Sequence, residues 1–387
     1  MAILFGLGFF CLSLLFSLFE RRSNIIVALT SFGILMIIFC FSYHNADYIV
    51  YEDLYHALKK TTNYSLEALD IFPLVGYLRT DYGYVFITKV FYDLGFSYFD
   101  YRVITIGVFF VVIFLISKRI VDFPIFVLLL YFIYPAFVDV VQIRNWYVEI
   151  FLLAGIYWMA SGEKYRNLVF VLFIILAATI HVAALVYLPF VLFLYIREYK
   201  YGNGLLSIMC CVGILSPLWA NLIIAQVPFF LDLAISSNIG GMNYLTDPIG
   251  VRHFVAYVAV MVMCGTMYFI KKQYEKGVLS LDNIKKRYIY LVYDISVYFL
   301  VLSPLYSLSK ELGRVPRNAV LLFYIALAIY ITNIKSTHTK TVIVVLSVIF
   351  AAAYGYVDFY MSVGAAEVHK ILQNNIVFDF FYENFGI

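Results

Sequence analysis

Charged side chains are scarce in this chain. Asp, Glu, Lys and Arg make up 13% of its 387 residues, whereas hydrophobic residues make up 64%. A soluble domain carries about 25% charged residues, because its water-facing surface needs them. Long apolar runs recur from end to end, and no polar stretch is long enough to form a second core. We therefore expect residues 1–387 to form a single polytopic membrane domain.

Several functional motifs are also absent. The five cysteines all lie in apolar runs without a Cys-x-x-Cys pair, which argues against structural disulfides and a zinc site. The outer loops have no Asp-x-Asp pair for a divalent metal. The chain has no Gly-x-Ser-x-Gly elbow and no phosphate-binding Walker loop. We expect no metal, no cofactor and no use of ATP. No basic block indicates binding to nucleic acid.

The apolar runs predict an all-α protein with about twelve transmembrane helices. A crossing needs about 20 apolar residues, and shorter helices are tolerated inside a bundle. The run at 168–196 would be one long helix, but this would place the strongly basic 271–287 loop outside, so we expect a break near His181. The predicted spans are 2–19, 25–43, 101–117, 123–140, 146–160, 168–181, 182–196, 204–224, 254–270, 288–306, 319–333 and 341–361.

Loop charges predict the orientation of these spans. If the N-terminus is outside, every inner loop is basic, as expected for the cytoplasmic side of a membrane. Acidic residues instead gather in 44–100, a large outer segment in which we expect amphipathic or re-entrant helices. Smaller outer loops are predicted at 225–253 and 307–318. The tail after residue 362 would also lie outside and could fold back as a short helix.

Three outer arginines form a candidate anion site. Arg144, Arg314 and Arg317 each lie at or just before the outer start of a helix. The planar guanidinium group offers several N–H donors to one phosphate group. The alternative is that each arginine extends to the lipid headgroups or pairs with Asp139 or Glu311.

Other outer residues are candidates for proton transfer or for a secondary role in binding. Asp47 follows the second predicted helix, and His181 lies at the predicted helix break. Either side chain could accept a proton from a sugar hydroxyl. Their alternatives are a headgroup-level Asp-Tyr pattern and a histidine that satisfies the carbonyls of a broken helix. Asp81, Arg79 and Arg252 are secondary candidates.

Five short motifs occur in order along the chain. They are Asn45-Ala-Asp-Tyr-x-x-Tyr51, Asp81-Tyr-Gly-Tyr84, Gln142-Ile-Arg-Asn145, Ile180-His-Val-Ala-Ala184 and Arg314-Val-Pro-Arg-Asn318. With these motifs the chain resembles the EpsG-type branch of the Wzy-like bacterial polysaccharide polymerases, which extend O-antigen, capsule or exopolysaccharide chains. The family more often has Gly-Thr-Asp-Tyr in the first motif, Glu before Gly in the second and Gln after Arg in the third.

The resemblance implies a membrane glycosyltransferase similar in fold to the GT-C class. Its donor would be a glycan on undecaprenyl pyrophosphate, and its acceptor a lipid-linked repeat unit at the outer face of the bacterial cytoplasmic membrane. Arg144, Arg314 and Arg317 would hold the pyrophosphate, and Asp47 or His181 would be the base. A chain-length regulator and a flippase would be possible partners. The main alternative is that the chain is itself a flippase for lipid-linked oligosaccharides. This alternative is disfavoured because few charged residues lie deep in the predicted helices.

Overall fold

The structure of the protein is a computed structural model that describes residues 25–60, 64, 81–199, 202–215, 251–306, 313–360, 370–371 and 373–385. The predicted first span, Arg79 and nearly all of the 225–253 loop lie outside these residues. The backbone of Arg252 lies in a helix, but its side chain is outside the described part.

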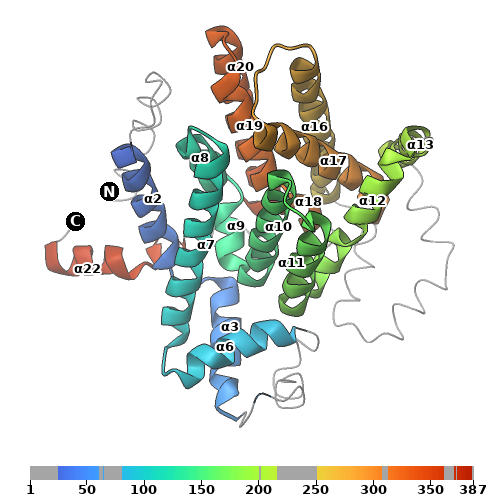
Figure 1. Ribbon diagram of the computed structural model, residues 1–387. Coiled ribbons are helices and arrows are strands. Elements are labelled where there is room, and N and C mark those ends of the chain that lie inside the picture. Colours follow the sequence, from blue (N-terminus) through green and yellow to red (C-terminus); the bar gives the residue numbers. More distant parts are fainter. Residues whose placement is uncertain are drawn as a thin grey trace.

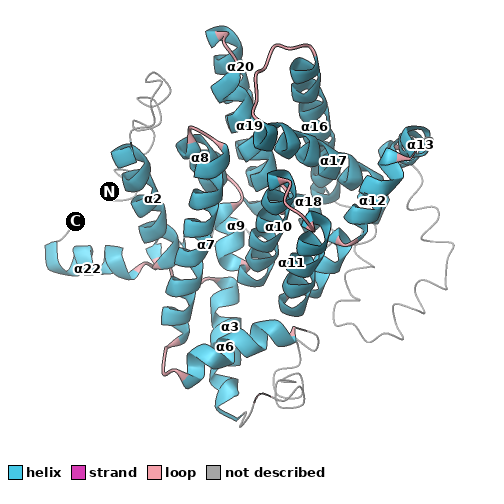
Figure 2. Ribbon diagram, in the orientation of Figure 1, coloured by secondary structure: helices cyan, strands magenta, loops and turns pink. Residues whose placement is uncertain are grey.

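The described residues form a helical protein (Figures 1 and 2). Their only β-structure is an isolated bridge between Ser42 and Asn375. The α-helices are α2 (Ile25–Cys40), α3 (Ala46–Ala57), α6 (Tyr82–Asp93), α7 (Tyr98–Ile120), α8 (Pro124–Ile133), α9 (Ala136–Val141), α10 (Ile143–Ser161), α11 (Arg166–Ile180), α12 (Pro189–Glu198), α13 (Gly202–Ile214), α16 (Val251–Glu275), α17 (Asn283–Tyr306), α18 (Arg314–Arg317), α19 (Val320–Asn333), α20 (Thr337–Gly355) and α22 (Ile376–Phe385). The remaining helical segments are η1 (Leu58–Lys60), η2 (Val182–Tyr187) and the π-helical η4 (Tyr356–Tyr360).

Four helical segments in the described part are long and apolar enough to cross a membrane. They are Tyr98–Ile120, Phe254–Glu275, Arg314–Asn333 and Thr337–Phe359. A 20-residue helix is about 30 Å long, which matches the hydrocarbon core of a bilayer. The chain is therefore an all-α membrane protein. Three further apolar helices have only 10–17 residues, so the count of twelve crossings remains a prediction.

Proline and histidine divide two of the predicted spans. The predicted helix at 123–140 is wrong, because α8 ends at Ile133 and α9 begins at Ala136, on either side of Pro135. Proline lacks an N–H and disfavours helical backbone in the residue before it. The predicted break near His181 is confirmed, since α11 ends at Ile180 and His181 has extended backbone angles.

The segment after this break is less regular than predicted. The predicted helix at 182–196 is replaced by η2, a 3₁₀ segment, followed by α12. Pro189 occupies the first turn of α12, where its missing N–H costs no helical hydrogen bond. The backbone therefore changes direction immediately after His181, and this change shapes the site described below.

The centre of the bundle is α19. Every residue from Val320 to Ile331 is buried, as expected for a helix that is apolar on all sides. Helices α8, α17 and α20 pack against it, and α10 packs between α11 and α17. Figure 1 shows α3 and α6 together at one end of the bundle.

The chain tail returns to the end of α2. The backbone N–H of Tyr43 donates to the Asn374 carbonyl at 2.9 Å, and Asn375 Nδ2 donates to the Ile37 carbonyl at 3.0 Å. The Tyr43 hydroxyl also donates to Asp379 on α22 at 2.8 Å. The short helix expected after residue 362 is thus present, and it lies beside the start of the 44–100 segment.

Candidate functional site

Arg144 lies in the first turn of α10 and contacts two residues of the 44–100 segment. Its guanidinium group forms an ion pair with Asp81, and its Nε donates a 2.7 Å hydrogen bond to the Tyr51 hydroxyl. The guanidinium carbon also lies 5.3 Å from the centre of the Tyr51 ring. Because 22% of the Arg144 side chain remains exposed, part of its donor set can still reach another anion.

Asp81 is the buried partner that orients Arg144. It immediately precedes α6 and is 4% exposed. Burial raises the pKa of the Asp81 carboxyl, while Arg144 and the backbone N–H of Val182 oppose this rise by stabilising the carboxylate. Asp81 therefore links the start of α6 both to α10 and to the break after α11.

Asp47 and Tyr51 lie one turn apart on α3, on the same helix face. The helix begins there because Asn45 caps it, accepting a 3.1 Å hydrogen bond from the backbone N–H of Tyr48. Burial raises the pKa of Tyr51, Arg144 opposes that rise and Asp47 adds to it. Asp47 itself is half-buried, and it acts electrostatically on the Tyr51 hydroxyl that Arg144 contacts.

His181 lies within electrostatic reach of all three predicted arginines, Arg144, Arg314 and Arg317. Its side chain is half-buried, and its Nδ1 atom is buried without a hydrogen-bond partner among the described residues. Three neighbouring positive charges disfavour a fourth. Burial and these charges therefore favour the neutral imidazole, and a bound anion would have to offset the arginine charges before His181 could accept a proton.

Arg317 is held more tightly than the other two arginines. It is 0% exposed, and it donates to Gln142 Oε1 at 2.6 Å and to Asp358 Oδ2 at 3.4 Å. Asp358 in turn accepts a 2.8 Å hydrogen bond from the Tyr134 hydroxyl. An arginine so enclosed contributes its charge more readily than new hydrogen bonds. Arg314, one helical turn earlier, is half-buried.

A second set of contacts fixes α18, the helix that carries Arg314 and Arg317. Asn145 and Asn318 exchange side-chain amide hydrogen bonds of 2.7 and 3.2 Å. The Tyr187 hydroxyl donates to the Val315 carbonyl at 2.8 Å. These bonds join α18 to α10 and to η2, so the arginine-bearing segments are held in register by buried polar contacts.

Asp139 is one of the two acidic residues predicted as alternative partners for these arginines, but its hydrogen bond is to another side chain. Asp139 accepts a 2.8 Å hydrogen bond from the Tyr131 hydroxyl, which also lies 3.5 Å from a Glu149 carboxylate oxygen. Arg317 acts on both carboxyls electrostatically, but its ion pair is with Asp358. Glu311 lies outside the described residues.

Sequence reasoning did not single out Tyr51, Gln142, Asn145, Asn318 or Asp358 as site residues. Four of them could have been found, because they lie inside the motifs quoted above and flank the proposed functional residues. Asp358 could have been flagged as a rare acidic residue in an apolar helix, since such residues usually have a partner or a function. Its pairing with Arg317 could not have been foreseen.

Among the residues that the structure describes, no cluster of three or more His, Cys, Asp or Glu side chains could hold a metal ion. The positive charge of the site comes from guanidinium groups. The arrangement can bind a multiply charged anion next to a group that accepts a proton.

Comparison with known proteins decides the family. A family model described as the EpsG family matches residues 25–371. The chain belongs to the EpsG family. All the contacts of Arg144, His181 and Arg317 described above lie within the matched region. No curated protein and no solved structure matched the chain. Membership of the EpsG family supports a role in polysaccharide polymerisation.

Proposed function

We propose that the protein polymerises lipid-linked oligosaccharide repeat units. The glycan would be transferred from undecaprenyl pyrophosphate to a hydroxyl of the acceptor sugar. The bond between the anomeric carbon and the pyrophosphate oxygen breaks, a glycosidic bond forms, and undecaprenyl pyrophosphate leaves. The observation that carries the proposal is that three arginines act electrostatically on one histidine, His181, in a chain of the EpsG family.

The arginines would stabilise the leaving group, on which negative charge grows during the reaction. Arg144 and Arg314 are the half-buried members and would donate hydrogen bonds to the pyrophosphate. Arg317, held by Gln142 and Asp358, would contribute mainly its charge. Fixed donors of this kind act without reorganising during the reaction. Because these groups supply the positive charge, we propose a metal-independent transferase.

The acceptor hydroxyl must lose a proton, and two residues are placed to receive it. His181 has a buried nitrogen without a partner among the described residues, whereas Asp47 offers an accessible carboxylate near Tyr51. A general base must come within about 3 Å of the proton that it removes. We propose His181 as the first candidate, because all three arginines act on it electrostatically, and Asp47 as the second.

The setting of the reaction is also part of the proposal. The protein would cross the bacterial cytoplasmic membrane about twelve times in a GT-C-like arrangement, with its site facing the periplasm or exterior. Arg79 and Arg252 would add positive charge around the entrance. Partners would include the lipid-linked oligosaccharide, a flippase and a chain-length regulator. The lipid pyrophosphate bond supplies the free energy, so no nucleotide is required.

A deletion strain distinguishes this function from that of a flippase. Without a polymerase, single repeat units still reach the cell surface and are ligated there. Electrophoresis then shows one glycan band in place of the ladder of chain lengths. Without a flippase, no repeat unit reaches the surface. The ladder is measured by electrophoresis of surface glycan and restored with the wild-type chain. Complete loss of surface repeats from a viable deletion strain would contradict the polymerase assignment.

A further inference from the structure

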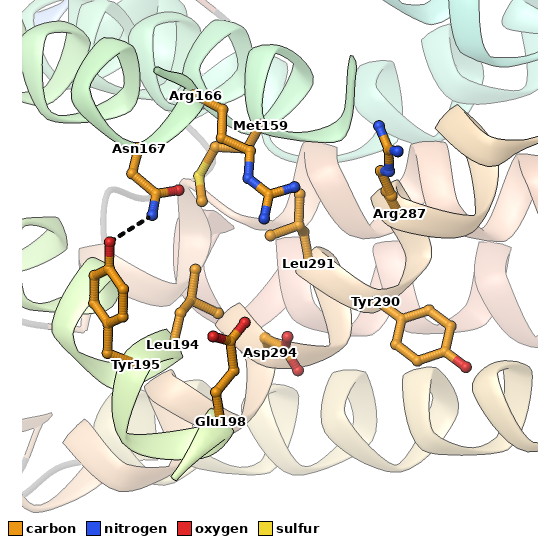
Figure 3. Close-up of a pocket in the computed structure, with 10 residues that line it drawn as sticks. All are labelled: Met159, Arg166, Asn167, Leu194, Tyr195, Glu198, Arg287, Tyr290, Leu291 and Asp294. Atoms are coloured by element: carbon orange, nitrogen blue, oxygen red, sulfur yellow. Dashed lines mark hydrogen bonds between the residues drawn. The ribbon is translucent and has the colours of Figure 1, made fainter. Parts of the chain in front are cut away.

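A polar cavity lies at the far end of α10 and α11 from Arg144. It has a volume of about 330 Å³ and is lined by residues that include Arg166, Asn167, Glu198, Arg287 and Asp294 (Figure 3). An adjoining cavity of about 500 Å³ shares Glu198 and Asp294 with it. Together the cavities reach the size of ordinary small-ligand sites.

This cavity is separate from the candidate site around His181. Arg144 is the second residue of α10 and Ser161 is its last, so the two are about 26 Å apart along the helix at a rise of about 1.5 Å per residue. Arg287 on the cavity wall donates to the Ser161 carbonyl at 3.1 Å. Likewise, Arg166 begins α11 and His181 follows its last residue. None of the proposed site residues lines either cavity.

The lining is positively charged overall. The two cavities are bordered by Arg166, Arg197, Lys271 and Arg287, and by two acidic residues, Glu198 and Asp294. Arg197 forms an ion pair with Asp294 and thereby neutralises it. Four basic and two acidic groups leave an excess of two positive charges, which favours an anionic ligand.

Arg166 is the cation best placed to receive that anion. Figure 3 shows its side chain extending into the space between Met159 and Leu291. In the described part of the chain, no hydrogen bond or ion pair engages its guanidinium group. Arg166 also opens α11, and no side chain caps this end of the helix. The first backbone N–H groups of a helix are unsatisfied and carry a partial positive charge. They therefore add to the electrostatic attraction of an anion.

The surroundings of the cavity favour a lipid over a soluble anion. Tyr195 lines the cavity, accepts a 3.3 Å hydrogen bond from Asn167 and is 58% exposed. Next to it on α12, Leu192 and Ile196 are 64% and 38% exposed. Exposed apolar side chains of a membrane protein face acyl chains, and basic pockets between membrane helices hold lipid headgroups.

We propose that this cavity binds the headgroup of an anionic glycerophospholipid, in the leaflet opposite the Arg144 site. The phosphodiester lies against Arg166 and the start of α11. Asn167 and Glu198 contact the polar remainder of the headgroup, and the acyl chains run along the exposed face of α12. The lipid thereby joins α11, α12 and α17, which supply most of the residues that line the two cavities.

Lipid binding to the purified full-length protein tests this proposal. The protein is freed of native lipid in detergent, and native mass spectrometry then measures its binding of phosphatidylglycerol, phosphatidylcholine and inorganic phosphate. We expect tight binding of phosphatidylglycerol alone. Removing a charged hydrogen-bond donor weakens binding by roughly ten- to a hundredfold, so Arg166→Gln should weaken phosphatidylglycerol binding by that factor.

Arg119→Gln is the matched control. Arg119 is exposed in the last turn of α7 and lines neither cavity, so its removal deletes the same charge elsewhere and should leave the affinity unchanged. Equal weakening by both variants would indicate general charge attraction and overturn the proposal. Binding of inorganic phosphate as tight as that of the lipid would replace it with a soluble-anion site. The measurement does not depend on polymerase activity, so it stands apart from the proposed function.

Discussion

The arginines around His181 differ in how much of each guanidinium group is already engaged. Arg317 is enclosed between Gln142 and Asp358 and is 0% exposed. Arg144 also has a carboxylate partner, yet 22% of its side chain is exposed. An anion can therefore approach Arg144 without breaking its ion pair. At Arg317 it would have to displace Gln142 or Asp358, because the side chain is fully buried.

At the scale of the residue, we predict that Arg144→Lys loses most polymerase activity while the protein still inserts and folds. Lysine keeps the charge, but it cannot contact Asp81, Tyr51 and a pyrophosphate at once, because it lacks the planar donor set. Loss of one such donor typically costs about 3 kcal/mol, or roughly a hundredfold in rate. Purified protein and lipid-linked repeat units in vitro provide the measurement.

Arg119→Lys serves as the control and should keep the wild-type rate. Within the described part of the chain, the one hydrogen bond of the Arg119 side chain is the 3.4 Å bond to Tyr157, far from the site. If Arg144 merely extended to the lipid headgroups, lysine would replace it without loss, because any cation on an apolar stem can do so. A near wild-type rate for Arg144→Lys would thus remove Arg144 from the mechanism and leave Arg314 to bind the pyrophosphate, with Arg317 adding its charge.

At the scale of the element, the site depends on how closely α6 approaches α11. Gly83 lies two residues after Asp81, and a Cβ atom added to it would come within 2.8 Å of the Thr179 Cβ and 2.9 Å of the Thr179 carbonyl carbon. Such contacts are closer than real Cβ atoms show, so the two helices would have to separate. Glycine at this position allows Asp81 to reach both Arg144 and the backbone of Val182.

We therefore predict that Gly83→Ala reduces polymerase activity at least tenfold. Separating α6 from α11 would shift Asp81 away from Arg144, and misplacing a positioning group by about 1 Å can cost roughly a hundredfold in rate. The rate is measured in the same assay, alongside the thermal unfolding of the detergent-solubilised protein.

Gly265→Ala is the matched control for this substitution. Gly265 lies within α16, and an added Cβ would meet nothing within 4 Å. Alanine there should leave activity unchanged and stabilise the helix by up to about 1 kcal/mol. Full activity in Gly83→Ala would show that the close approach of α6 and α11 does not position the site.

At the scale of the whole molecule, the charge pattern predicts a fixed orientation. The segment with Asp47 and Asp81 should lie outside the cell, and the basic 271–287 loop should lie inside. Placing the basic loop outside would oppose the usual excess of Lys and Arg on the cytoplasmic side. The two ends of α10 then face different aqueous phases, with Arg144 on the outer side.

Cysteine labelling of intact cells measures this orientation. In a variant that lacks the five native cysteines, a membrane-impermeant maleimide should label Lys60→Cys and spare Lys276→Cys. Both positions should react after the cells are permeabilised, which controls for accessibility. The opposite labelling pattern would place the candidate site in the cytoplasm and exclude an extracytoplasmic polymerase of this orientation.

Sequence reasoning anticipated individual residues of the site better than their contacts. Chemistry and membrane position point to Arg144, Arg317 and His181, and in the structure both arginines act electrostatically on His181. Asp81 was chosen as a possible proton acceptor, but it is the buried ion-pair partner of Arg144. The sequence does not show that Asp81 lies beside Arg144. A carboxylate in an ion pair with a guanidinium group positions that group and is less able to accept a proton.

The sequence by itself determined the class of the protein, the break at His181 and the family, because each depends on local information. Apolar runs of about 20 residues require lipid, and a short motif keeps its residues together in any fold. Only the tertiary structure decided which residues became partners. Arg144 and Asp81 are 63 positions apart, and Asn145 and Asn318 are 173 positions apart. Which distant helix faces which is set by packing over the whole bundle, and no local pattern encodes it.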